Sequence, residues 1–269
     1  MERYQFVTLL SSENYLDGVL CLNDSLHKVG SCAQLKCLVT SDISNVLIPF
    51  LKFFNIDYEI VERLHYRGID DKRLSNTASK IAIYNMDENF PMIYIDCDTY
   101  FLRCADELFS MPVGSATIVS DGDGTYRAMS SLFSFVPYKK TYQLLKSMVQ
   151  TVPGIMDGDI IMVTYNENIQ NKSMIMPYEK YNWPIDPDGK FLIDNKDVSI
   201  IHFILSHTKP WQMSDEEFDR HWGKHECMKQ YKKCLDAVRE KKNKLKKLIE
   251  TSKLLIDQEI ENINKSLGI

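Results

Sequence analysis

Two aspartates stand two residues apart at the end of an apolar run in the first half of the chain. Residues 92–95 are β-branched, aromatic or otherwise apolar, which is typical of a buried strand, and Asp96 and Asp98 follow at once. Carboxylates are costly to bury unless they are paired or hold a metal. We therefore expect both acids to bind a divalent cation that also grips an anionic substrate, with an acidic turn after a strand as the simpler alternative.

A second segment whose side chains could do chemistry lies about a hundred residues later. The apolar segment 198–205 delivers His202, and Lys209 follows seven residues further on, before Pro210 and Trp211. An imidazole can complete a carboxylate–metal site, and a lysine can balance the charge of a diphosphate. Taken singly, a histidine such as His202 is more often a hydrogen-bonded core residue than a ligand.

The elements that must position these residues alternate between strand and helix in the first sixty residues. The pattern predicts strands over 4–10, 35–40 and 58–61, with helices from Tyr15 to Leu26 and over 43–54. Such alternation predicts a parallel sheet, and ligands collect at the strand ends of such sheets, so residues 8–15 are a candidate nucleotide site. No G-x-G-x-x-G follows the first strand, which disfavours a dinucleotide fold.

A lysine and a cysteine lie close to the acidic pair. Lys80 belongs to a helix expected over 75–86, just ahead of the acids, where it could counter a phosphate or remain a solvated surface lysine. Cys97 separates the two acids, and in an extended strand its side chain would face away from them and pack.

Composition bounds the class of protein. With 269 residues, 44% of them hydrophobic, the chain can bury a large core and favours one large α/β domain. A net charge of -5 offers no general attraction to nucleic acid, and no run of about 18 apolar residues predicts a transmembrane segment. Seven cysteines without a C-x-x-C spacing, in a sequence without an export signal, favour reduced thiols and a cytoplasmic location.

The last part of the chain has a different composition. Residues 214–269 are rich in Lys and Glu, and an apolar stripe at helical spacing runs through them. The stripe consists of Leu245, Ile249, Ser252, Ile256, Ile260, Ile263 and Leu267. It predicts a helical tail after a domain over 1–213, and the tail either packs back on that domain or pairs two chains as a short coiled coil in a homodimer.

Several of these motifs, in this order along the chain, resemble those of the glycogenin-like retaining glycosyltransferases of family eight. The matching pieces are the Phe6-Val7-Thr8-Leu9 strand with Tyr15 and Gly18, the Asp96-Cys97-Asp98 centre with Asp106-Glu107-Leu108-Phe109, and His202-Phe203 with Lys209-Pro210-Trp211. The resemblance covers about residues 6–211. It implies a GT-A fold, with a mixed but mainly parallel sheet, that binds a UDP-sugar through Mn2+, or Mg2+ as the alternative.

The resemblance also implies roles for individual residues. Asp96, Asp98 and His202 would hold the metal, Lys209 would contact the diphosphate, and Leu9, Ser11, Ser12 and Tyr15 would line the uridine pocket. Cys97 is counted with the nucleotide-sugar set because it lies between the acids. Lys80 and Asp159 are the catalytic candidates, near the sugar and phosphate and at the reacting face respectively.

Three segments depart from the family pattern. Its Asn-x-Gly strand is Met129-Ser130-Ser131 here, its Gly-Asp-Gln-Gly segment is Gly158-Asp159-Ile160-Ile161, and a glycine expected between His202 and Lys209 is absent. We expect these changes to affect recognition of the sugar more than binding of the metal.

The resulting expectation is a Mn2+-dependent hexosyltransferase that moves glucose from a UDP-sugar to a hydroxyl of a separate acceptor: a glycan, a lipid, a polyol or another protein. A self-priming tyrosine is not expected, because no tyrosine lies between Tyr181 and His202. A nucleotide-sugar-binding protein with lost or weak turnover, and a metal-dependent phosphohydrolase, are the alternatives.

Overall fold

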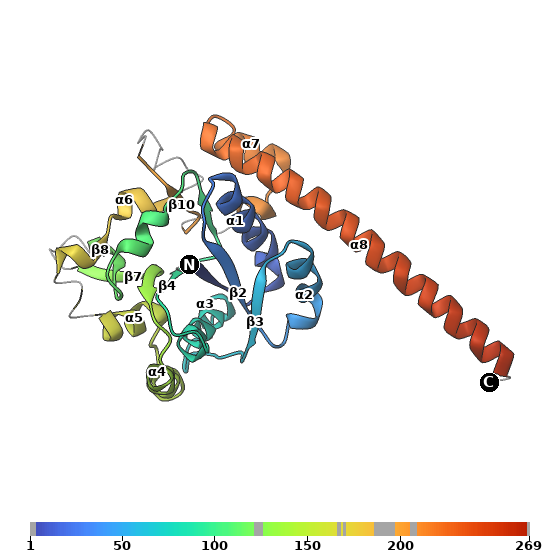
Figure 1. Ribbon diagram of the computed structural model, residues 1–269, viewed down its shortest axis with the longest axis horizontal. Helices are drawn as coiled ribbons and strands as arrows, with labels where there is room; N and C mark the ends of the chain where they lie inside the picture. The colour runs from blue at the N-terminus through green and yellow to red at the C-terminus, as the bar shows by residue number, and fades with distance from the viewer. Residues whose placement is uncertain are drawn as a thin grey trace.

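A computed structural model of the chain describes residues 4–120, 126–165, 168, 171–185, 197–204 and 209–267 (Figure 1). Its centre is a seven-stranded sheet with the order β3-β2-β1-β4-β7-β6-β8. The strands are β1 (Gln5–Leu10), β2 (Gln34–Thr40), β3 (Asp57–Val61), β4 (Met92–Ile95), β6 (Ala116–Ser120), β7 (Tyr126–Phe135) and β8 (Ile175–Met176). The pairs from β3 to β4 and the β6–β8 pair are parallel, and β7 is antiparallel to β4 and β6. The mixed, mainly parallel α/β sheet predicted from the sequence is therefore confirmed.

A second, smaller sheet lies beside the first and carries the histidine strand. It has the order β5-β10-β9, with β5 (Thr99–Phe101), β9 (Trp183–Pro184) and β10 (Ile200–His202). β10 runs antiparallel to β5 and pairs His202 with Thr99, which directly follows the acids. The two informative stretches of the sequence are thus neighbouring strands.

Helices cover both faces of the main sheet. The α-helices are α1 (Leu16–Lys28), α2 (Ser44–Phe53), α3 (Lys72–Ser75), α4 (Lys139–Thr151), α5 (Asp157–Tyr165), α6 (Tyr178–Tyr181), α7 (Asp215–Trp222) and α8 (Glu226–Leu267). The 3-10 helices are η1 (Glu13–Tyr15), η2 (Asn76–Asn85), η3 (Asp106–Ser110), η5 (Lys172–Met174) and η6 (Pro210–Gln212). The helix expected over 75–86 is therefore mostly a 3-10 helix.

The alternation of side chains along the central strands explains this layered arrangement. On β1, Phe6 and Leu10 belong to the core cluster that includes residues of α1, α2 and α8, whereas Val7 and Leu9 belong to the cluster that includes residues of η2, α4 and α5. Successive residues of a strand point to opposite faces, so a strand buried on both faces must be apolar throughout. This accounts for the continuous apolar run of β1.

The strand order changes direction between β1 and β4. The chain moves from β1 to β2 and β3 on one side, and then returns to place β4 on the other side of β1. The carboxyl ends of β1 and β4 therefore diverge at a topological switch point, where open α/β sheets bind ligands. Ser11 follows the first of these ends and Asp96 follows the second.

A glycine allows α1 to approach the turn that carries the acids. A Cβ atom at Gly18 would lie 2.7 Å from the backbone oxygen of Cys97 and 2.9 Å from a ring carbon of Trp211. Neither neighbour is a flexible chain end, so a larger residue would force the turn away from α1. Gly18 thus fixes the position of the turn between Asp96 and Asp98.

The expected tail has two parts that differ in their surroundings. The side chains of Phe218, Trp222, Tyr231 and Leu235 are buried in the same cluster as the central strands, and Leu245 packs against it. Further along the helix the side chains of Leu248, Leu254, Leu255, Ile256 and Ile260 are exposed, and Figure 1 shows this half of α8 extending away from the domain. The change in packing therefore falls within α8 rather than at residue 214. No helix in the described part of the chain is long and apolar enough to cross a membrane.

Candidate active site

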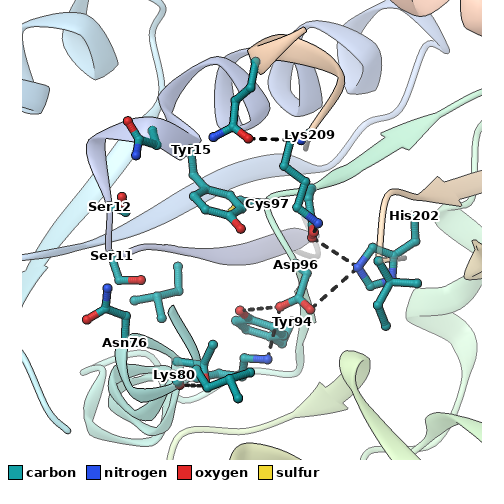
Figure 2. Close-up of a pocket in the computed structure, with 17 residues that line it drawn as sticks. Ser11, Ser12, Tyr15, Asn76, Lys80, Tyr94, Asp96, Cys97, His202 and Lys209 are labelled. Carbon is teal, nitrogen blue, oxygen red and sulfur yellow. Dashed lines mark hydrogen bonds and ion pairs between the residues drawn. The ribbon is translucent and has the colours of Figure 1, made fainter. Parts of the chain in front are cut away.

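A cavity of about 450 Å³ opens at the switch point between β1 and β4 (Figure 2). Its volume is in the range of roughly 300–1,000 Å³ that is usual for small-molecule sites. All but one of the site residues predicted from the sequence line it. They are Leu9, Ser11, Ser12, Tyr15, Lys80, Asp96, Cys97, Asp98, His202 and Lys209. Cys97 reaches the cavity because β4 ends at Ile95 and the chain turns there, so the expectation of an extended strand at Cys97 was wrong.

The two acids and the histidine form one cluster. Asp96, Asp98 and His202 each offer a ligand atom, and these atoms lie within 4.8 Å of one another. His202 Nε2 lies 3.1 Å from Asp98 Oδ1 and 3.9 Å from Asp96 Oδ2. Among the described residues, no second group of three or more acidic, histidine or cysteine side chains has this geometry.

The other ring nitrogen of His202 is held by an amide. Nδ1 lies 2.8 Å from Asn182 Oδ1, while the amide nitrogen of Asn182 donates to Ser131 Oγ at 2.8 Å. Because an amide oxygen only accepts, Nδ1 must carry a proton and donate it. In the neutral imidazole the lone pair of Nε2 then faces the carboxylates, as in metal sites where a second residue fixes the tautomer of a ligating histidine.

This donor set fits a divalent metal ion. In the neutral tautomer the Nε2 lone pair and the oxygens of Asp98 face each other at hydrogen-bond distance, an arrangement that needs a proton or a cation between them. Two carboxylates and one imidazole suit ions such as Mn2+ that accept both oxygen and nitrogen ligands. Asp96, Asp98 and His202 are therefore the residues that would hold the ion.

Lys209 closes the cluster from the side of η6. Its ammonium group donates to Asp98 Oδ2 at 2.8 Å and to the backbone oxygen of Phe203 at 2.6 Å. Phe203 in turn donates its backbone N–H to the carbonyl of Asp98, which ties the end of β10 to the acidic turn. Burial alone would raise the pKa of Asp98, but His202 and Lys209, which face its two oxygens, outweigh burial and hold the pKa below its usual value.

Lys80 lies at the opposite side of the acids and bridges two carboxylates. Its ammonium group is 2.7 Å from Asp157 Oδ2 and 3.1 Å from Asp96 Oδ1, and it lies over the ring of Tyr94. Lys80 is 3% exposed. Burial would lower its pKa, but the two carboxylates more than compensate and raise it, so Lys80 keeps its charge.

Asp157 occupies the position that the sequence analysis gave to Asp159. The carboxylate of Asp157 accepts hydrogen bonds from Lys80 and, at 2.5 Å, from Ser130 Oγ. Asp159 is exposed and accepts from the backbone N–H of Met156. Neither aspartate is among the residues that line the cavity. Asp157 and Asp159 both lie in the first turn of a helix, and the sequence gave no indication of which one would face Lys80. Asn182 was also missed as the partner of His202.

Comparisons with known proteins find glycosyltransferases among the relatives. No family model matches the sequence. Glycogenin-1 of Caenorhabditis elegans is 29% identical over 160 residues, which are 57% of this chain and 37% of that protein. Inositol phosphorylceramide glucuronosyltransferase 1 of Arabidopsis thaliana is 22% identical over 229 residues, 77% of this chain and 42% of that protein. The galactosyltransferase LgtC, crystallised with donor and acceptor sugar analogs, aligns with a TM-score of 0.60 and 14% identity over 87% of this chain and 95% of its own.

The chain resembles the glycogenins in sequence and has the GT-A fold. It spans about two fifths of the length of the two curated relatives described above, which share 37% and 42% of their lengths with it.

The departures of this glycogenin-like chain from the family pattern are incorporated into the site. Ser130, which stands in the altered Met129-Ser130-Ser131 segment, donates to Asp157, and Ser131 accepts from Asn182. Ile160 is fully buried in the core cluster formed with η2 and α4. The altered segments thus support Lys80 and His202 through hydrogen bonds and packing.

Proposed function

We propose that this chain is a Mn2+-dependent retaining glycosyltransferase that moves a hexosyl group from a UDP-sugar to a hydroxyl of a separate acceptor. The observation that carries the proposal is a carboxylate–imidazole cluster flanked by two buried lysines, Lys80 and Lys209, at one end of a cavity. The other end is walled by Leu9, Tyr15 and short polar side chains. A nucleoside diphosphate has the same division, with charge at one end and an aromatic base at the other.

The charges of the site support a metal requirement. Among the described residues, Asp96, Asp98 and Asp157 pair with the ammonium groups of Lys80 and Lys209, so the charged end is net negative when His202 is neutral. A net negative site repels a diphosphate, and a divalent cation reverses the sign. Bound there, the ion would supply electrostatic stabilisation to the departing diphosphate.

The residues of the chain would contribute to the chemistry in three ways. Lys209 would balance the negative charge that develops on the diphosphate, as a pre-organised cation in a water-poor site. Asp157, held by Lys80 and Ser130, would contact the donor sugar. Retention is assigned to attack on the face that the diphosphate leaves: the bond from the anomeric carbon to the phosphate oxygen breaks, the acceptor oxygen bonds to that carbon, and its proton passes to the phosphate oxygen.

Asp159 as a covalent nucleophile was the other mechanism expected from the sequence. Its exposed carboxylate, engaged with the backbone of Met156, argues against this role. Asp157 is closer to the acids but is already bound by Lys80 and Ser130, which reduces its nucleophilicity. We therefore assign retention to attack on the face that the diphosphate leaves.

Donor turnover is the direct test. Purified protein is incubated with UDP-glucose, UDP-galactose, UDP-N-acetylglucosamine and UDP-glucuronate, each with Mn2+, with Mg2+ and with chelator, and the nucleotide product is identified. Metal-dependent release of UDP, fastest from UDP-glucose, is expected. Release of UMP would favour the phosphohydrolase, and binding without any release would favour a nucleotide-sugar-binding protein. UDP-glucuronate is included because glucuronosyltransferases are among the relatives.

The acceptor is proposed to be a separate molecule. Reaction requires a hydroxyl held within about 3–3.5 Å of the anomeric carbon, and the segment between Tyr181 and His202 contains no tyrosine to supply one. The hydroxyl of Tyr181 itself donates to Glu107 at 2.8 Å and is therefore engaged. Intact mass after incubation with UDP-glucose and Mn2+ should be unchanged. A ladder of hexoses mapped to any tyrosine would overturn this part of the proposal.

A reducing compartment such as the cytoplasm is also part of the proposal. It is supported by seven cysteines that form no disulfide, of which Cys32 and Cys104 are exposed.

A further inference from the structure

An asparagine that the sequence analysis did not single out lines the end of the cavity away from the metal cluster. Asn76 is the first residue of η2, is half-buried, and lines the cavity together with Leu9, Ser11 and Thr77. Figure 2 shows it beside Ser11, across the cavity from His202. In the function proposed above, the diphosphate occupies the charged end, so the base of the nucleotide would extend toward Asn76.

The orientation of this amide is fixed by an arginine behind it. Arg63 follows β3, and its NH1 group donates to Asn76 Oδ1 at 2.8 Å. A guanidinium group has donors only, so the amide of Asn76 must turn its oxygen toward Arg63. Within the described part of the chain, the amide nitrogen of Asn76 has no hydrogen-bond partner. The wall of the cavity therefore offers an N–H donor at this point and has no free amide oxygen.

Arg63 is itself held too firmly to release the amide easily. Its side chain is 15% exposed. It donates to the backbone oxygen of Ser11 at 2.6 Å, to Thr40 Oγ1 at 2.8 Å and to Asp42 Oδ1 at 2.9 Å. These partners follow or end β1 and β2, at the carboxyl edge of the sheet where the cavity lies. The guanidinium group thus links two strand ends and the start of η2, and it cannot rotate without breaking several hydrogen bonds.

We propose that Asn76, oriented by Arg63, selects the base of the donor nucleotide by donating a hydrogen bond to a ring carbonyl. This inference rests on the function proposed above. Uracil presents a carbonyl oxygen at position 4, whereas cytosine presents an amino group there, which is a donor. A fixed amide donor can hydrogen-bond to the carbonyl of uracil, whereas with cytosine two donors would face each other. Asn76 is then a specificity-determining residue, and Arg63 is a positioning residue that acts through it.

Metal-dependent binding of UDP and CDP is the measurement, made by calorimetry in Mn2+ on the full chain. The wild-type protein should bind UDP at least about tenfold more tightly than CDP. Asn76→Asp keeps an oxygen toward Arg63 but places an acceptor in the cavity. The ratio of the affinity for UDP to the affinity for CDP should therefore fall by at least about tenfold and can invert. The added charge weakens both nucleotides alike and cancels in the ratio. Asn243→Asp, on the exposed part of α8, is the matched control and should leave the ratio unchanged.

Arg63→Lys tests the positioning role separately. The shorter ammonium group cannot hold Asn76 and Ser11 together, so the ratio should approach one while Mn2+-dependent binding of both nucleotides persists. A melting curve checks that this variant is folded, and Asn76→Asp provides the test if it is not.

The possible failures can be told apart. If the wild-type protein binds neither nucleotide in Mn2+, the proposed function and this inference both fall. If it binds UDP and CDP equally, or if Asn76→Asp keeps the wild-type ratio, the inference alone is wrong. If Asn76→Asp lost affinity for UDP and CDP by the same factor, Asn76 would contact the ribose or no part of the nucleotide. This result would also overturn the inference.

Discussion

The two ends of the cavity are built on opposite principles. At the metal end, every charged side chain is bound to at least one other: Lys209 to Asp98, and Lys80 to both Asp96 and Asp157. At the other end, called the base end below, the wall consists of a few apolar or aromatic side chains and of uncharged polar ones, and the amide of Asn76 is held by an arginine. In the function proposed above, the first end would recognise charge, which all nucleoside diphosphates share, and the second would distinguish one base from another. Changes at the metal end should therefore cost far more activity.

The largest loss is expected from Asp98→Asn. One oxygen of Asp98 faces His202 and the other faces Lys209, so a single amide weakens the metal site and the diphosphate contact together. Affinity for UDP in Mn2+ should fall by at least about 100-fold, while the fold is retained because an amide fills the same volume. Calorimetry with a melting curve is the measurement. The control is Asp87→Asn, whose side chain is 92% exposed.

Asp96→Asn should behave like Asp98→Asn, and His202→Ala should weaken the metal less completely. If Asp98→Asn bound Mn2+ and UDP as tightly as the wild type, the assignment of the metal end would be wrong.

A smaller loss of affinity, with a clear loss of stability, is expected from Lys80→Met. It leaves Asp157 and Asp96 without their shared cation, and breaking a buried pair in this way costs about 3–5 kcal/mol. Turnover should fall by roughly 100-fold. Urea unfolding and donor turnover measure the two effects. The double variant with Asp157→Asn should recover much of the stability without recovering turnover, and recovery of both would mean that Lys80 has only a structural role.

Loss of the amide behind His202 should have a graded effect. Asn182→Ala removes the acceptor that fixes the protonated nitrogen of His202, and such changes lower metal affinity by about 10- to 100-fold. Asn182→Asp keeps an acceptor and should lose less. Titration with Mn2+ compares the two variants. Equal losses would show that packing around residue 182, and not the tautomer of His202, matters at the metal end.

Removing the projecting half of α8 should have the smallest effect on the two ends of the cavity. Residues 215–245 supply buried side chains, so a cut at residue 214 would damage the core. A cut after Lys247 instead removes a part in which Leu248, Leu254, Leu255, Ile256 and Ile260 are exposed. Turnover and UDP binding should stay within about twofold, because nothing in this half lines the cavity.

The same truncation tests whether the stripe joins two chains. About three heptads is near the lower limit for a stable coiled coil, so any dimer held by the projecting half should be concentration-dependent. Light scattering of the full and truncated chains compares their masses over a range of concentrations. Equal masses throughout would remove the hypothesis of a homodimer through α8.

The sequence by itself determined the sheet, and it predicted the acidic residues of the cluster at one edge of it. Buried strands have a local signature, and the carboxyl ends of parallel strands meet at one edge, so Asp96, Asp98 and the nucleotide-binding segment after β1 could be placed together without coordinates. His202 and Lys209 were candidates from their positions in the sequence, but their roles came from the family resemblance, since a histidine at the end of an apolar strand does not by itself predict a ligand. Their contacts with Asp98 were then found in the structure.

Only the tertiary structure decided which neighbouring groups complete the site. Asp157 and Asp159 are two residues apart on α5, which separates them by about 200° around the helix, and the packing of the buried Ile160 selects which one faces Lys80. Asn182 and Arg63 reach His202 and Asn76 from distant elements. The point where α8 leaves the core likewise depends on α1 and the central strands. Each of these features is set by contacts between segments far apart in the chain, which helical spacing and strand alternation do not encode.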